Sequence, residues 1–139
     1  MEVRTYREQV KTEGDSAVLD LTSLAERALS NSGLKAGILN VFVPGSTAGV
    51  TTIEYETGAV RDLRAAIERL VPKSLHYEHD RRWGDGNGYS HVRAALLKAG
   101  LAVPFEGGRL LLGTWQQLVL IDFDNRPRTR EVLFQLVGV

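Results

Sequence analysis

Apolar residues recur along this chain in short runs that Gly, Pro and Asp interrupt. Residues 2–11 and 16–20 predict two strands joined as a hairpin, because Glu13-Gly14-Asp15 between them supplies the backbone angles of a tight turn. The run from Gly37 to Val43 is apolar almost throughout, which is typical of a central strand covered on both faces. The other β-rich runs predict strands at 50–55, 101–105, 109–124 with a bend at Gly113, and 130–137.

Three segments have the three- and four-residue spacing of amphipathic helices. Ser23 and Glu26 have capping-box spacing ahead of a helix over 23–32 that Gly33 ends. A second helix is expected from Thr57 to the residues before Pro72, and a third from near Ser90 to Gly100. Since strands and helices do not alternate strictly, we expect one α+β domain over residues 1–139. It would contain a mixed or antiparallel sheet with about three helices packed on it.

The composition of the chain excludes several classes of partner and metal ligand. The 139 residues suffice for one hydrophobic core, and 17 basic residues balance 17 acidic ones. Because the charges balance, the protein has no overall electrostatic attraction to nucleic acid or to a membrane surface. We therefore expect neither as a partner. The chain has no cysteine, so His and carboxylates are its only strong metal ligands. Its charged start and the lack of a long apolar run favour the cytoplasm.

The loop from Tyr77 to Gly88 is polar, Gly-rich and long for a compact domain, and such loops are often functional. His79 and His91 flank it. Imidazoles titrate near neutrality and ligate metals, so the two form the nucleus of a candidate site; two surface imidazoles are the alternative. Asn87 either points into the same space or only forms the turn. His76 is expected to be structural or solvated.

Other candidate residues lie at strand ends. Glu54 is expected near the interior, where a carboxylate needs a charged or metal partner. Ser46 and Thr47 follow a buried strand and suit substrate contacts. Gln116 either orients a ligand or braces a neighbouring loop. Three alternating arginines form either an anion-binding row or a charged strand edge; they are Arg126, Arg128 and Arg130.

Four segments together resemble the YjbQ-like family, some members of which are described as secondary thiamine-phosphate synthases. They are PGSTAGVTTIEYE (44–56), YEHD with NGYSH (77–80 and 87–91), GTWQ (113–116) and RPRTR (126–130). The resemblance runs from about Gly37 to Gly138. It implies a small α/β fold that assembles as a homotrimer, with a polar site near subunit boundaries.

The resemblance also implies a cluster of three histidines, and here the chain departs from it. Many relatives have His-Thr-Thr-Ala where this chain has Gly45-Ser46-Thr47-Ala48, so the first histidine is absent. The remaining set would be His79 and His91 with Glu54, as ligands of zinc, magnesium or manganese. Without a metal, the histidines would act as acid/base groups or only form hydrogen bonds.

The function that the resemblance implies is an enzyme acting on a small phosphorylated molecule. The named reaction joins a pyrimidine diphosphate to a thiazole phosphate and releases pyrophosphate. His79, His91 and Glu54 would be catalytic. Substrate or cofactor would contact a polar set comprising Asn87, Ser46, Thr47, Gln116, Arg128 and Arg130. The alternative is a non-catalytic, trimeric metal- or ligand-binding protein.

Overall fold

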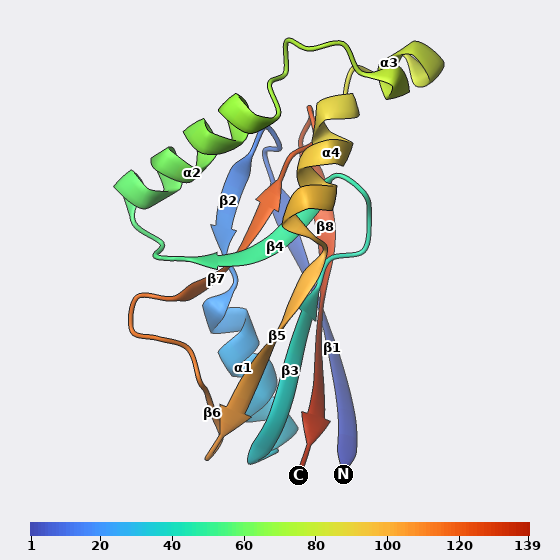
Figure 1. The fold of residues 1–139 in the computed structure, drawn as a ribbon. Coiled ribbons are helices and arrows are strands. Elements are labelled where there is room, and N and C mark those ends of the chain that lie inside the picture. Colours follow the sequence, from blue (N-terminus) through green and yellow to red (C-terminus); the bar gives the residue numbers. More distant parts are fainter.

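The apolar runs are divided between two antiparallel sheets (Figure 1). The computed structural model describes all 139 residues. The first sheet has the order β1 (Glu2–Thr12), β8 (Arg128–Gly138), β3 (Ala36–Phe42), β5 (Gly100–Glu106), β6 (Arg109–Leu110). The second has the order β2 (Ala17–Asp20), β7 (Gln117–Asp122), β4 (Ala48–Ile53). The α+β class is confirmed, with every strand pair antiparallel.

The three expected helices are present, and a fourth lies in the polar loop. They are α1 (Thr22–Ser32), α2 (Thr57–Leu70), α3 (Glu78–Trp83) and α4 (Gly88–Leu97). The capping-box prediction is wrong, because α1 has no side-chain cap of that kind and the Thr22 N–H instead donates to the Asp20 carboxylate. Glu56 caps α2 by accepting from two backbone N–H groups. None of the four helices has the length and apolar run needed to cross a membrane.

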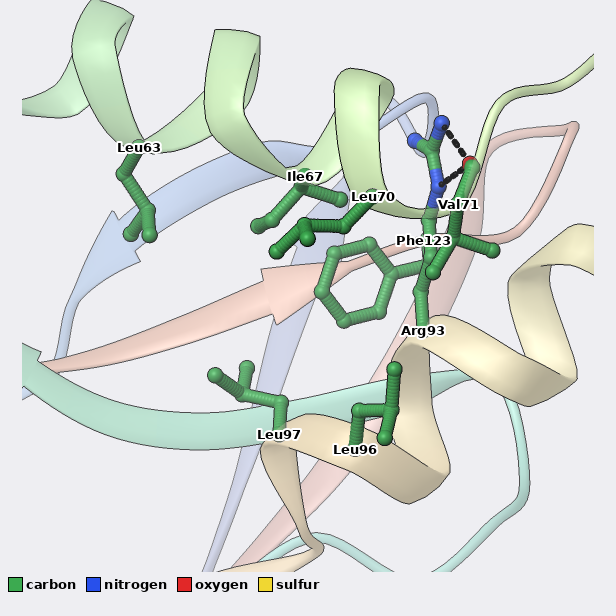
Figure 2. A pocket seen from close by; sticks show the side chains of 8 residues that line it. All are labelled: Leu63, Ile67, Leu70, Val71, Arg93, Leu96, Leu97 and Phe123. Carbon is green, nitrogen blue, oxygen red and sulfur yellow. Dashed lines mark hydrogen bonds between the residues drawn. The ribbon is translucent and has the colours of Figure 1, made fainter.

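The main core lies between the two sheets and is closed by α1. Alternate residues of β8 point inward, as the period of a strand requires; Val132, Phe134 and Leu136 are fully buried. The opposite face of the second sheet is covered by α2 and α4. Ile121 and Phe123 pack there against both helices, which leave a small apolar hollow of about 170 Å³ between them (Figure 2). This second cluster fixes α4, and with it His91.

The predicted N-terminal hairpin is wrong, although both of its strands exist. β1 pairs with β8 and β2 pairs with β7, so the two strands belong to different sheets. Gly14, Asp15 and Ser16 all have positive φ, at 71°, 52° and 64°, and they turn the chain from one sheet into the other. The backbone N–H of Asp15 donates to the Asp124 carbonyl at 2.7 Å, which holds this crossing in place.

The first sheet leaves one face uncovered in the single chain. β3 was expected to be covered on both faces, but Ile38 is 52% exposed and Phe42 is 40% exposed. Their cross-strand neighbours Val137 and Leu133 lie on the same face. The prediction is therefore wrong for the single chain, because α1 packs on the inner side of this sheet.

Candidate functional site

The polar loop folds back on itself and brings His79 on α3 and His91 on α4 together. Their ring centroids are 4.2 Å apart, and the ring planes are tilted by 37°. Gly84 ends α3 with the left-handed backbone (φ 70°) typical of a helix C-cap. The two imidazoles, twelve residues apart in sequence, thus share one site.

The Nδ1 atom of His79 is buried and has no hydrogen-bond partner. It lies 3.7 Å from Asp80 Oδ1 and 3.5 Å from Asp85 Oδ1. One ligand atom from each of these three residues falls within 4.8 Å of the others. An unsatisfied buried nitrogen is costly, so this atom, close to two carboxylates, is a candidate ligand for a bound group.

A glycine sets the start of α4 beside α3. The backbone N–H of Gly88 donates to Asp80 Oδ1 at 2.8 Å. A Cβ at this position would lie 2.5 Å from the Cβ of Tyr77, closer than real side chains come, so a larger residue would displace the loop. The Asn87-Gly88 pair therefore has a packing role that keeps His91 facing His79.

Asn87 lies between two carboxylates and links the histidine loop to the sheet. Its Nδ2 donates to Asp124 Oδ1 at 3.3 Å, and with the amide turned over it would donate to Asp85 Oδ1 at 3.1 Å. Asp124 is 2% exposed and also accepts from Thr47 Oγ1 at 3.2 Å. Arg128 Nη1 approaches the same carboxylate to 3.1 Å.

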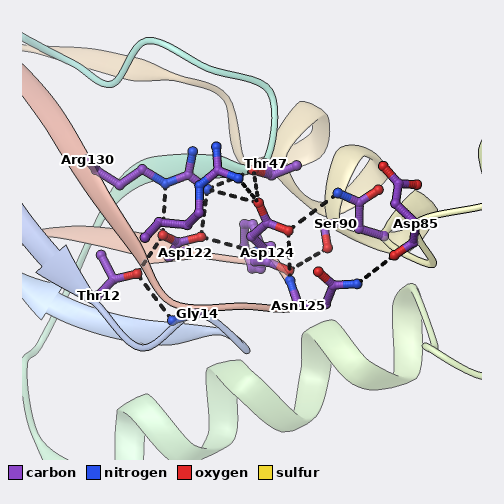
Figure 3. Close-up of polar contacts among 12 residues, drawn as sticks. Thr12, Gly14, Thr47, Asp85, Ser90, Asp122, Asp124, Asn125 and Arg130 are labelled. Atoms are coloured by element: carbon purple, nitrogen blue, oxygen red, sulfur yellow. Dashed lines mark hydrogen bonds and ion pairs between the residues drawn. The ribbon is translucent and has the colours of Figure 1, made fainter. Parts of the chain in front are cut away.

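Arg130 and Asp122 form a buried ion pair behind this network (Figure 3). Arg130 Nε and Nη2 donate to the two oxygens of Asp122, both at 2.8 Å, which is the bidentate geometry of strong Arg–carboxylate pairs. Thr12 Oγ1 donates to Asp122 as well, at 2.6 Å. Burial alone would raise the pKa of Asp122, but the hydrogen bonds from Arg130 and Thr12 outweigh it and hold the pKa below its usual range.

The surroundings of His91 favour its neutral form. Desolvation lowers the pKa of His91, and the neighbouring His79 lowers it further, while Asp85, Asp124 and Asp80 oppose the shift. A neutral imidazole has a free lone pair, which a metal ligand or a general base requires.

Most of the predicted site residues meet in this region. His79, His91 and Asn87 form the loop side, and Thr47, Arg128 and Arg130 form the network behind it. Ser46 lines a hollow together with His91. Of the three alternating arginines, Arg126 is exposed and only the other two enter the network.

The structure does not bring Glu54 and Gln116 to the histidines of the same chain. β4 ends at Ile53, so Glu54 is exposed beyond the strand instead of interior, and it lines a separate hollow with Trp115. The predicted ligand set with Glu54 is therefore wrong within one chain. Gln116 braces a turn: its Oε1 accepts from the Gly113 N–H at 3.0 Å and its Nε2 donates to Thr52 at 3.3 Å.

The sequence reasoning missed the carboxylates that complete the region, namely Asp80, Asp85, Asp122 and Asp124. The sequence did contain a signal for Asp122 and Asp124. They follow an apolar strand in alternation, where a buried carboxylate needs a cation, and the arginines come four to eight residues later.

Comparison with known proteins matches this chain to one family. The sequence model described as "UPF0047 protein YjbQ-like" matches residues 6–139. The chain belongs to this YjbQ-like family. A UPF0047 protein of Archaeoglobus fulgidus is 36% identical over 89% of this chain and 94% of its own length. One of Mycobacterium bovis is 38% identical over 86% of this chain and 91% of its own length.

Solved structures share the fold of this chain. A protein of Aeropyrum pernix K1 has a TM-score of 0.88 at 33% identity and covers both chains completely. A YbjQ-like protein of unknown function from Sulfolobus solfataricus has a TM-score of 0.89 at 27% identity, over 99% of this chain and 100% of its own. The two sheets and the helices that position the histidine loop thus belong to the family fold.

Proposed function

We propose that this YjbQ-like protein is a metal-assisted enzyme that acts on a small phosphorylated molecule, with His79, His91 and Asp85 as ligands of a divalent ion. The observation that carries the proposal is the buried, unpartnered Nδ1 of His79, which faces two carboxylates beside a second imidazole. Asp85 replaces Glu54 in the ligand set, because Glu54 lies elsewhere in the chain. Asp80 is partly committed to Gly88 and adds negative charge nearby.

The donor set fits such an ion. Imidazole nitrogens with carboxylate oxygens suit zinc or manganese, and carboxylates suit magnesium. When bound, a divalent ion offsets charge that develops on phosphate oxygens. The protein's own contribution is orientation: Asn87 and Asp124 hold the loop, and the depressed pKa of His91 keeps that imidazole free to bind at neutral pH.

Within this class we propose a reaction of the secondary thiamine-phosphate synthase type. A pyrimidine diphosphate would be joined to a thiazole phosphate, with pyrophosphate leaving. The support is the resemblance of the sequence motifs together with an ion site of the kind that diphosphate chemistry uses. We also place this enzyme in the cytoplasm and assign it neither a nucleic acid nor a membrane partner, on its balanced charge.

The alternative function is a non-catalytic, trimeric metal- or ligand-binding protein. The absence of an imidazole at Gly45 favours it, since the three-histidine cluster that the resemblance implies is incomplete in this chain. Product formation above background by purified protein, abolished in the His91→Ala variant, would exclude this alternative. Tight binding of both substrates without conversion would support it.

Metal analysis tests the proposed function. Purified protein is expected to hold a near-stoichiometric divalent ion, and His79→Ala, His91→Ala and Asp85→Ala are each expected to lower that content at least tenfold, because each removes a ligand. The matched control is His76→Ala, whose side chain is 65% exposed and lies 3.6 Å from Glu78. Elemental analysis of all five proteins gives the result. Wild type without metal, even after incubation with zinc or manganese, would overturn the proposal.

We further propose that the uncovered face of the first sheet is a homotrimer interface. Val3, Ile38 and Val137 lie in one row across three strands and are 58%, 52% and 39% exposed. A contiguous apolar patch of this kind is rarely left open in a monomer.

The mass of the protein in solution tests the interface. Wild type is expected to elute as a trimer, and Ile38→Glu is expected to dissociate it because a charge would be buried on the face. Val92→Glu, at another exposed apolar position on α4, serves as the control. Light scattering after size-exclusion chromatography measures the mass. A wild-type monomer would contradict the interface, as would an Ile38→Glu trimer.

A further inference from the structure

A small hollow opens directly beside His91, between α4 and the loop that follows β3. It measures about 280 Å³ and is lined on one side by Gly45 and Ser46 and on the other by His91, Ala95 and Lys98. We call it the His91 hollow. Its remaining lining residues are alanines, and none of the lining residues is acidic. Since ligand pockets usually measure about 300–1,000 Å³, it suits one end group of a ligand instead of a whole substrate.

A buried cation stands behind Gly45. Arg130 uses Nε and Nη2 for Asp122 and Thr47, but its Nη1 makes no hydrogen bond within the chain. The side chain is only 6% exposed. The Nη1 atom lies 3.4 Å from the position that a Cβ on residue 45 would occupy. Because residue 45 is glycine, with φ 124°, no side chain fills the space in front of this unused donor.

A second cation, Lys98, lines the hollow, and its backbone is strained. Lys98 has φ 80°, which is unusual for a residue with a side chain. Its carbonyl accepts from the Val50 N–H at 3.0 Å, and its own N–H donates to Ala94. This close approach depends on Gly49, since a Cβ there would lie 2.8 Å from the Lys98 carbonyl oxygen. A strained backbone that several neighbouring contacts hold in place is typical of functional positions.

From these observations we infer that the His91 hollow binds the anionic end group of the substrate, a phosphate or diphosphate. Lys98, the Ser46 hydroxyl and Arg130 Nη1 would be its donors. Lys98 forms no ion pair within the chain, whereas Arg128 and Arg130 are balanced by two aspartates. An anion would therefore meet an uncompensated positive charge. The inference rests on the proposed function for its substrate class, and it assigns a subsite to that class.

Calorimetry with inorganic pyrophosphate tests the subsite, on protein as purified and after treatment with a chelator. Wild type is expected to bind pyrophosphate in both states. Lys98→Gln is expected to weaken binding about tenfold or more, because a charge-assisted hydrogen bond is lost. Its matched control is Lys35→Gln, which removes an exposed lysine outside the hollow.

A second variant tests whether the His91 hollow must be empty for pyrophosphate to bind. Ala95→Leu is expected to fill the hollow and abolish binding, whereas Ala65→Leu, on the exposed face of α2, leaves binding unchanged. The melting temperature of each variant shows that it is folded.

The outcomes separate this inference from the metal assignment, because metal content is measured on the same samples. Pyrophosphate binding that disappears with the chelator, or that is unchanged in Lys98→Gln, overturns the subsite and leaves the ion site standing. Pyrophosphate binding that depends on Lys98, in a protein that holds no metal as purified or after incubation with zinc or manganese, supports the subsite and overturns the ion site. Wild type that binds no pyrophosphate in either state also overturns the subsite.

Discussion

Replacing Asp122 by alanine is expected to lower the free energy of unfolding by about 3–5 kcal/mol, because breaking a buried ion pair leaves the other charge uncompensated. Asp122 is fully buried and accepts hydrogen bonds from Arg130 at two atoms and from Thr12. The variant leaves the Arg130 guanidinium, 6% exposed, with the more distant Asp124 as its only carboxylate partner. Since domains are stable by about 5–15 kcal/mol, this loss removes a large fraction of the stability of the folded protein.

Urea unfolding measures this effect, with Asp62→Ala as the control. Asp62 is an exposed acidic residue on α2 that forms no ion pair, so its removal should change stability by less than about 0.5 kcal/mol. Equal effects of the two substitutions would contradict the importance of the pair.

The same pair predicts how stability depends on pH. The folded-state pKa of Asp122 is lowered, so the folded protein binds its proton less readily than the unfolded chain. Its contribution is therefore fully present above the unfolded value of about 3.9 and is lost as the pH falls through the folded value. In Asp122→Asn the free energy of unfolding should fall less steeply as the pH is lowered into the acid range. An unchanged acid limb in that variant would show that other carboxylates control acid unfolding.

Most strands and helices could be predicted from the sequence, because each has a local pattern, but the single bent strand expected over 109–124 is two strands, β6 and β7, with residues 111–116 outside both. The apolar stripe of α2 and the glycine after α1 fixed the limits of those helices to within about two residues. Strand partners could not be predicted in the same way. The pairing of β1 with β8 joins residues more than a hundred positions apart, and no local signal distinguishes it from a hairpin with β2.

The same difference between local and long-range contacts applies to the candidate site. His79, Asn87 and His91 come from one continuous segment, so their proximity follows from a single loop. Glu54 was added because a carboxylate in a strand would be buried, but β4 ends one residue earlier and exposes it. Element boundaries are the least certain part of any sequence-based prediction, and here one residue decides whether a ligand is interior.

The structural role of Arg93 could not be predicted from the sequence. There it is only one polar residue on an amphipathic helix. In the structure it is 4% exposed and joins three elements. Its Nε and Nη2 both donate to the Val71 carbonyl after α2, at 3.0 and 2.8 Å (Figure 2), and its Nη1 donates to Ser16 at 3.0 Å. It also pairs with Glu68 on α2. Arg93 thereby fixes α4 against α2 and the crossing between the sheets.

Arg93→Ala is expected to lower the free energy of unfolding by about 3 kcal/mol, because it leaves the buried Val71 carbonyl and Ser16 hydroxyl unsatisfied and removes packed methylenes. Arg93→Lys should recover little, since an ammonium group cannot reproduce the guanidinium's several directed hydrogen bonds. Arg61→Ala, at an exposed position of α2, is the control. Urea denaturation of the four proteins measures the effect.

The pKa of Glu68 provides a second measurement that a general loss of packing would not move. The hydrogen bond from Arg93 is the main reason that this pKa is lowered in the folded protein. In Arg93→Ala the Glu68 carboxyl should titrate nearer its ordinary value, as followed by NMR. An unchanged Glu68 pKa together with wild-type stability would show that α4, and the histidine it carries, is held by the apolar cluster around Phe123 alone.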